Sequence, residues 1–202
     1  MSATPHEELH VDLDLLVDRW LPLPPPGADV ETWAFDAAAE LGEIDGQPDA
    51  VARLNEQLLL WARDPGRADH DLAAVLVPEA QVGVYAWLTA AQLSEAPATV
   101  VQLEQIARSV AHVGEAEVSQ VPLPAGPAVR TRGIRAADRD DGLGELVEQV
   151  RWWVLPPLLA AGPDPQSVEI TMCWSAAAAH EADDLAELAD DIAATLVVRP
   201  VE

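Results

Sequence analysis

The chain has 202 residues and a formal net charge of −24, and every one of its eleven basic residues is an arginine, because the sequence contains no lysine. The missing lysine excludes P-loop phosphate binding, pyridoxal Schiff-base chemistry and the protein-kinase mechanism. The negative charge argues against nucleic acid as a partner, since phosphate backbones are bound by lysine and arginine.

Cysteine content and hydropathy bear on the compartment. Cys173 is the only cysteine, so no disulfide framework can form within the chain and a reducing compartment is expected. The first residues lack the basic and apolar regions of a signal peptide. The longest uncharged run, Ala80–Ser94, is shorter than the roughly 18 residues of a membrane span. We therefore expect a cytoplasmic protein that does not insert into a membrane.

The acidity itself has two interpretations. Abundant Ala, Pro, Val and Asp, arginine in place of lysine and a single Asn are typical of a high-GC genome, so the charge can reflect a bias of the whole proteome. Alternatively, an acidic surface engages a basic partner, as in a nuclease inhibitor. The composition favours the first interpretation, because runs of charge usually form solvated faces.

Residues 1–30 predict an N-terminal arm. Thr4, Pro5 and Glu7 form a capping box with proline at the first helical position. A helix would then place four apolar side chains on one face, at Leu9, Leu13, Leu16 and Trp20. The alternation over residues 11–15 equally suits a strand. Prolines between positions 22 and 26 end either element, so residues 31–202 are expected to form one α+β domain.

Apolar periodicity predicts the elements of that domain in chain order. Helices are expected over residues 49–63, 98–111 and 181–197. Strands are expected over residues 71–77, 82–89, 115–123, 128–135, 145–155 and 167–174. This order predicts an α+β fold in which helices pack on a mostly antiparallel sheet of about six strands, as in an α/β/α sandwich.

The element order over residues 49–198 resembles the PsbP-like α/β/α sandwich. Three segments are also similar to uncharacterised actinobacterial proteins of this size: Leu123–Arg130, Trp152–Pro156 and Ile192–Leu196. Such proteins resemble accessory products encoded with secretion or cell-envelope genes. The resemblance implies a non-enzymatic binding role and transfers no site residues.

One metal motif is present by pattern. His6, Glu7 and His10 satisfy H-E-x-x-H, in which two histidines bind zinc and the glutamate polarises water. Glu7 already serves the capping box, and Glu8 puts a charge where zinc proteases have an uncharged residue. We therefore expect no metal site.

Arginines concentrate in one strand. Arg130, Arg132, Arg135 and Arg139 lie within ten residues of an otherwise acidic chain. Arg130 and Arg132 share a strand face and are the candidate binding residues, as a fork for a carboxylate or a phosphate. The alternative is that they pair with acidic side chains of the sheet or of the last helix.

The single cysteine and a pair of adjacent tryptophans are more typical of core packing than of a catalytic site. A thiol–imidazole pair of Cys173 with His112 or His180 is conceivable, but a cysteine between Met172 and Trp174 is more typical of a core. The adjacent Trp152 and Trp153 must point to opposite faces of their strand. One is then in the core, and the other lies under a helix or on the surface.

These observations predict a non-catalytic, soluble interaction or accessory protein whose partner is another protein. No catalytic residue and no cofactor are expected. Two alternatives stay open: an acidic inhibitor or immunity-type protein that binds a basic partner, and an enzyme with an unrecognised site.

Overall fold

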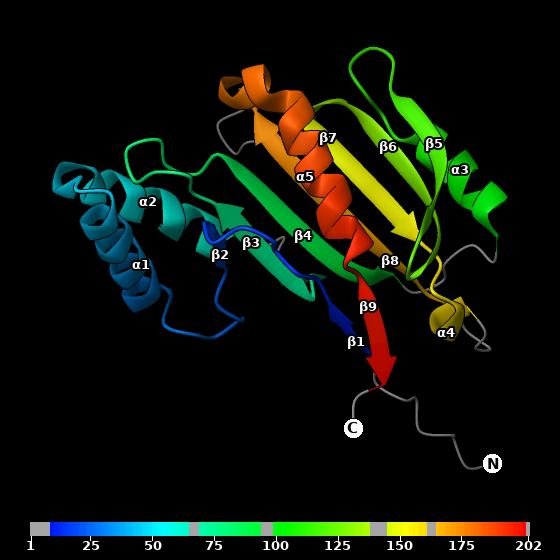
Figure 1. Ribbon diagram of the computed structural model, residues 1–202, viewed down its shortest axis with the longest axis horizontal. Helices are drawn as coiled ribbons and strands as arrows, with labels where there is room; N and C mark the ends of the chain where they lie inside the picture. The colour runs from blue at the N-terminus through cyan, green and yellow to red at the C-terminus, as the bar shows by residue number, and fades with distance from the viewer. Residues whose placement is uncertain (1–8, 65–68, 94–98, 138–144, 161–164, 201–202) are drawn as a thin grey trace.

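The computed structural model describes residues 9–64, 69–93, 99–137, 145–160 and 165–200. The helices are α1 (Val30–Ile44), α2 (Val51–Ala62), α3 (Val100–Ser109), α4 (Pro157–Ala160) and α5 (Ala182–Ala194). The strands are β1 (Leu9–Asp12), β2 (Trp20–Pro22), β3 (Leu72–Leu76), β4 (Ala86–Leu93), β5 (Glu117–Leu123), β6 (Gly126–Ala137), β7 (Glu145–Val154), β8 (Ser167–Ser175) and β9 (Val197–Pro200). Figure 1 shows their arrangement.

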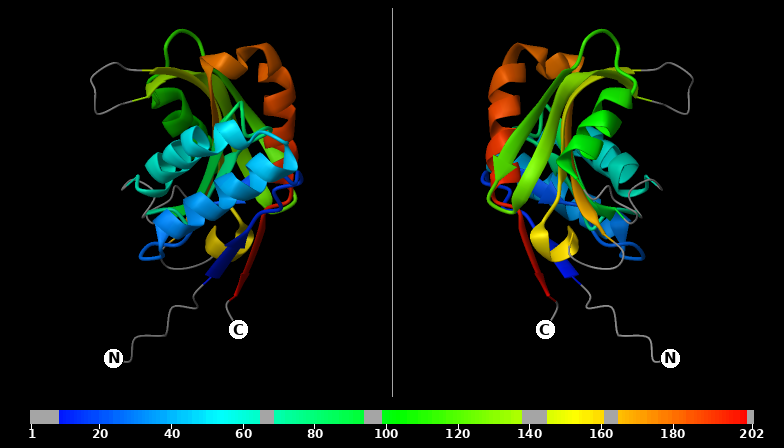
Figure 2. Two further views of the ribbon diagram at one scale, coloured as in Figure 1. Left: turned by 90° about the vertical axis from the view of Figure 1, so that its left-hand side faces the viewer. Right: turned by 90° about the vertical axis from the view of Figure 1, so that its right-hand side faces the viewer.

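Seven strands form the main sheet, in the order β2-β3-β4-β8-β7-β6-β5, and all neighbours are antiparallel. Helices lie on both faces of this sheet (Figure 2). The α+β class with an antiparallel sheet and helices packed on it is therefore confirmed.

Helix α5 covers one face of the sheet. Its buried side chains, among them Leu185 and Ile192, meet the strand residues that alternation directs toward them. In β8 these residues are Val168, Ile170, Met172 and Trp174, every second position of the strand. Each large apolar side chain buried in this way stabilises the fold by about 1.5–3 kcal/mol.

The other face of the sheet is covered in two separate places. Helices α1 and α2 bury the β3 side, around Val75 and Val77, and α3 buries the β6 and β7 side, around Val129 and Trp153. Both tryptophans of the Trp152–Trp153 pair are thus covered, Trp152 in the α5 layer and Trp153 under α3. Between the two helical groups the sheet carries polar side chains.

The hairpin between β5 and β6 explains one glycine of the Leu123–Arg130 segment. Leu123 pairs with Gly126 across a two-residue turn. Gly126 has φ 147°, and a Cβ there would lie 2.4 Å from the Leu155 carbonyl oxygen. Only glycine allows this conformation and this close approach, so the turn holds β6 against the end of β7.

The N-terminal region differs from the predicted helix. In its described part, β1 pairs with β9 and β2 pairs with β3, so the strand alternative is nearer the structure. Trp20 is buried in the α5 layer because its neighbour across the sheet, Leu76, faces the same way. Tertiary pairing here outweighs the helical spacing of the leucines. The division of the chain at residue 30 stays a prediction.

Most other elements lie close to their predicted positions. The exceptions are α1, α4 and β9, which were not predicted from the sequence, and β4, which begins at Ala86 and not at residue 82. Helix α1 is rich in alanine and has Asp29 as its N-cap, with the Asp29 carboxylate accepting from Thr32 N–H. None of the helices in the described part of the chain is long and apolar enough to cross a membrane.

Candidate functional site

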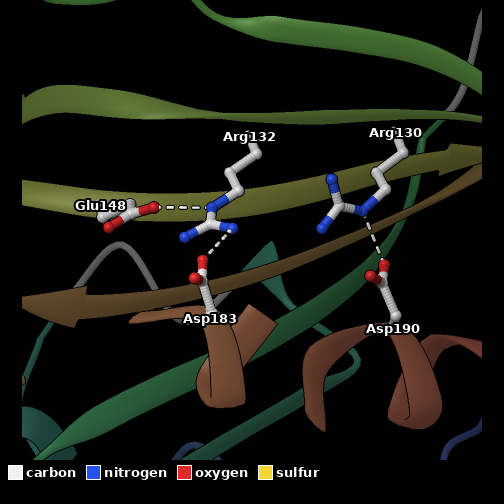
Figure 3. A network of polar contacts seen from close by, with 5 residues as sticks. All are labelled: Arg130, Arg132, Glu148, Asp183 and Asp190. Carbon is white, nitrogen blue, oxygen red and sulfur yellow. Dashed lines mark hydrogen bonds and ion pairs between the residues drawn. The ribbon is translucent and has the colours of Figure 1, made fainter. Parts of the chain in front are cut away.

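The two arginines predicted as a binding fork lie side by side on β6 and face α5 (Figure 3). Arg130 Nε lies 2.6 Å from Asp190 Oδ1. Arg132 Nε lies 2.7 Å from Glu148 Oε1, and Arg132 Nη1 lies 2.8 Å from Asp183 Oδ1. The strand face that they share is as predicted, and their charges meet acids of this same chain.

Both side chains are largely buried by this arrangement. The Arg130 side chain is 14% exposed, and its guanidinium lies 5.9 Å from the ring centroid of Trp152. Burial works against the charge of Arg132, but hydrogen bonds to Glu148 and Asp183 outweigh it and raise its pKa. A binding role for Arg130 and Arg132 stays a prediction, and their geometry fits the anchoring of α5 to the sheet.

A cavity of about 370 Å³ opens on the other face of the sheet. Strand residues that point away from α5 line it, from β3, β4, β7 and β8: Ala73, Trp87, Thr89, Val147, Arg151, Glu169, Thr171 and Cys173. Residues before β3 complete the lining, including Leu23, Trp61, Asp64 and His70. The cavity therefore depends on strands that come together only in the folded sheet.

The lining includes two arginines, Arg151 and Arg135, that have different interaction partners. Arg151 Nη1 lies 3.5 Å from Glu169 Oε2, and its guanidinium lies 5.4 Å from the Trp153 ring centroid. Arg135 Nη1 lies 3.5 Å from Gln149 Oε1, at the limit of a hydrogen bond. Within the described residues no carboxylate lies at ion-pair distance from Arg135. Because side chains alternate along β6, Arg135 faces the cavity while Arg130 and Arg132 face α5.

Several buried polar atoms at this face lack a partner in the described chain. They include Thr171 Oγ1, Gln149 Nε2, Arg151 Nε, Thr131 Oγ1 and His70 Nδ1. Thr171 lines the cavity and is 8% exposed, and Gln149, at 0%, contacts the cavity residues Arg135 and Cys173. An unpaired buried polar atom destabilises a fold by about 1–3 kcal/mol, so such a group in a cavity marks a place where polar atoms of a ligand can bind.

Aromatic rings form the apolar part of the lining. Trp61 of α2 and Trp87 of β4 lie with their ring centroids 4.7 Å apart and their planes tilted by 39°. Leu23 and Val147 add aliphatic surface. The site thus combines an apolar wall with polar strand residues, as small-molecule sites commonly do.

Cys173 lies in the lining with its thiol protonated. Burial, the largest effect, raises the pKa of Cys173 to about 12, against smaller opposite effects of Arg135 and Arg151. Its sulfur lies 3.9 Å from Gln149 Oε1, and its side chain is in the core as predicted.

The two histidines considered as partners of Cys173 lie in other settings. Burial lowers the pKa of His112, and Arg151 and Arg135 lower it further. The His112 ring lies against Gly133, where a Cβ would be 2.7 Å from His112 Nδ1. His180 Nε2 lies 3.5 Å from Glu181 Oε1. Of the zinc motif, His6 and Glu7 lie outside the described residues, while His10 is on β1, 2.9 Å from Asp12.

The sequence contained only part of the signal for this cavity. Arg135 was among the four clustered arginines, and its odd position against the even pair Arg130 and Arg132 predicts the opposite strand face. Arg151, Thr171 and Trp87 reach the cavity lining because of the order of the strands in the sheet. No local sequence pattern reveals that order.

Comparisons with known proteins give little further information. No family model matches the sequence, and no curated protein matches it. One solved structure that resembles the fold is the crystal structure of LpqN, a protein involved in cell envelope biogenesis of Mycobacterium tuberculosis. It is 13% identical, with a TM-score of 0.47, and the match covers 98% of this chain and 87% of that chain. At these values the likeness carries no residue or activity across, and the PsbP-like part of the sequence resemblance stays a prediction.

Proposed function

We propose that this chain is a non-catalytic accessory protein that works by binding, and that the cavity on the sheet face opposite α5 is its binding site. The observation that carries this proposal is the set of buried polar atoms that have no partner among the described residues, at a cavity of about 370 Å³. That volume falls within the roughly 300–1,000 Å³ typical of small-molecule sites.

The reactive groups of the lining are in states suited to binding. The thiol of Cys173, with a pKa of about 12, is protonated at neutral pH and is a poor nucleophile. The carboxylate of Glu169 lies 3.5 Å from the Arg151 guanidinium, so it is engaged in an ion pair within the lining. A protonated thiol and a carboxylate already held in an ion pair favour a site that holds a ligand unchanged.

The cellular setting and the partner are further parts of the proposal. A role beside a secretion or cell-envelope system, with another protein as partner, is supported by the sequence resemblance of the Leu123–Arg130, Trp152–Pro156 and Ile192–Leu196 segments. In this setting the chain would present or sense its ligand for the partner.

The binding site is tested with N-phenyl-1-naphthylamine, a neutral dye whose fluorescence rises in apolar surroundings. We expect one dye molecule per chain, with a micromolar Kd. Ala73→Phe fills the cavity from β3, where Ala73 is half-buried, and should weaken dye binding at least tenfold.

Ala136→Phe is the matched control, since Ala136 is exposed on β6 and points to the other face of the sheet. It should leave the Kd within twofold. Equal dye binding by wild type and Ala73→Phe, with both variants folded by circular dichroism, would show that the cavity is not the site.

A further inference from the structure

We infer that the ligand of this cavity is a monocarboxylate with a flat apolar body. This inference rests on the proposed function and adds the chemical class of the ligand. Three observations lead to it: an arginine that has no acidic partner among the described residues, the donor character of the unpaired atoms, and the tryptophan pair in the lining.

The first observation is that Arg135 pairs with no acid in the part of the chain that the structure describes. Acidic residues number 35 against eleven arginines, so an arginine without an acidic neighbour is unexpected. Seven other arginines of the described chain lie close to an acid: Arg19 with Asp45, Arg63 with Glu31, Arg108 with Glu104, Arg130 with Asp190, Arg132 with Glu148, Arg151 with Glu169, and Arg199 with Asp12. Arg53, at the edge of α2, donates to the Gln81 carbonyl oxygen. Arg135 has instead the amide oxygen of Gln149 at 3.5 Å. Its guanidinium retains donors for an anion.

The second observation is that two of the unpaired buried atoms can only donate. Gln149 Nε2 and Arg151 Nε are N–H donors, and Thr171 Oγ1 can donate or accept. The amide orientation of Gln149 is consistent, because its oxygen meets Arg135 Nη1 and the Cys173 thiol, both of which donate. The ligand must therefore offer acceptor oxygens, which a carboxylate provides in a flat pair.

The charge of the lining favours a ligand with one negative charge over a dianion. Glu169 and Asp64 also line the cavity, against Arg135 and Arg151. Glu169 is beside Arg151, so one arginine charge is already opposed. The two arginines and the two acids cancel in formal charge, so a monoanion adds one uncompensated negative charge, whereas a dianion such as a phosphate monoester adds two and is repelled more strongly by both acids.

The third observation concerns the body of the ligand. Trp61, Trp87, Leu23 and Val147 give the cavity an apolar lining in which the two rings lie 4.7 Å apart. Flat rings pack against tryptophan in offset or tilted geometries. The cavity volume of about 370 Å³ suits a body of one or two fused rings.

The experiment compares 2-naphthoate with 2-naphthalenemethanol, which has the same ring system but no charge. Calorimetry at low ionic strength should show the carboxylate binding at least tenfold more tightly than the alcohol. Arg135→Gln should remove this preference by weakening naphthoate and leaving the alcohol unchanged. Arg108→Gln, on α3, is the control and should leave both affinities unchanged.

Thr171→Val provides a second variant that preserves the shape of the side chain. Its hydroxyl has no partner in the described part of the chain, so the fold should tolerate the change, while naphthoate should bind more weakly. Equal binding of acid and alcohol by wild type would overturn the carboxylate inference and leave the cavity proposal intact. Failure of both naphthalene compounds and of the neutral dye to bind would instead overturn the proposed function, and the inference with it.

Discussion

At the scale of single residues, Cys173 shows how burial controls reactivity. Its side chain is 4% exposed and its pKa is raised to about 12, chiefly by burial, so at pH 8 the thiolate is on the order of one thiol in 10⁴. We expect Ellman's reagent to label the native protein at least a hundredfold more slowly than the protein in guanidinium chloride. Rapid labelling of the native chain would mean that the thiol is accessible, and would reopen the alternative of an enzyme.

The same residue predicts a dependence of stability on pH. The folded pKa of Cys173 lies above its ordinary value of 9.0, so the unfolded chain loses the thiol proton first as the pH rises. The contribution of the protonated Cys173 thiol to the free energy of unfolding is complete below pH 9 and is lost as the pH rises from 9 toward 12. The free energy of unfolding should fall over this range less steeply in Cys173→Ala than in wild type.

At the scale of elements, the contact between β6 and α5 is the place to test the arginine pair. Arg130 and Arg132 lie between the sheet and the acids of α5, and both are more than three-quarters buried. Replacing Arg130 with alanine removes a short ion pair and the packing of its stem, and should destabilise the fold by about 1–3 kcal/mol. The double change to alanine should lower Tm further in thermal denaturation.

Arg108→Ala is the control for this prediction, because its partner Glu104 lies one helical turn away on exposed α3, where such pairs contribute little. The double variant should keep the affinity of wild type for naphthoate, since both arginines face away from the cavity. A weakened affinity with an unchanged Tm would support the binding fork predicted from the sequence.

The helices and strands differ in how well the sequence alone predicts them. Strands β5 to β8 and helices α2, α3 and α5 were predictable because a periodic apolar pattern ends at proline, glycine or polar segments. Helix α1 was missed because alanine makes up much of its buried face, which gives a weak contrast between its two sides. Strands β1 and β2 depend on partners distant in the sequence, Val197–Pro200 and Ala74–Leu76, so no local pattern specifies them.

The candidate site was harder to predict than the fold for the same reason. Arg130 and Arg132 stood out as neighbours in sequence, yet acids from β7 and α5 meet them in the structure. The cavity gathers Arg135, Arg151 and Thr171 from three strands, and each alone resembles an ordinary strand residue. Polar residues on an otherwise apolar strand were the available signal, since Gln149 and Thr171 interrupt the buried faces of β7 and β8.

At the scale of the whole molecule, the net charge of −24 destabilises the folded state, and added salt reduces this effect. Repulsion among so many acids disfavours the compact state, and salt screens it with a Debye length of roughly 10 Å at 0.1 M and 3 Å at 1 M. Salt also weakens ion pairs, but exposed pairs such as Arg63–Glu31 contribute only marginally to stability. Screening of the repulsion should therefore dominate, and Tm should rise by several degrees between 20 mM and 500 mM NaCl at pH 7.

KCl should act equally, because the effect depends on ionic strength and not on a specific cation site. A Tm that falls with added salt would show instead that the arginine–acid pairs, and not the excess of acids, control the electrostatic stability of the fold.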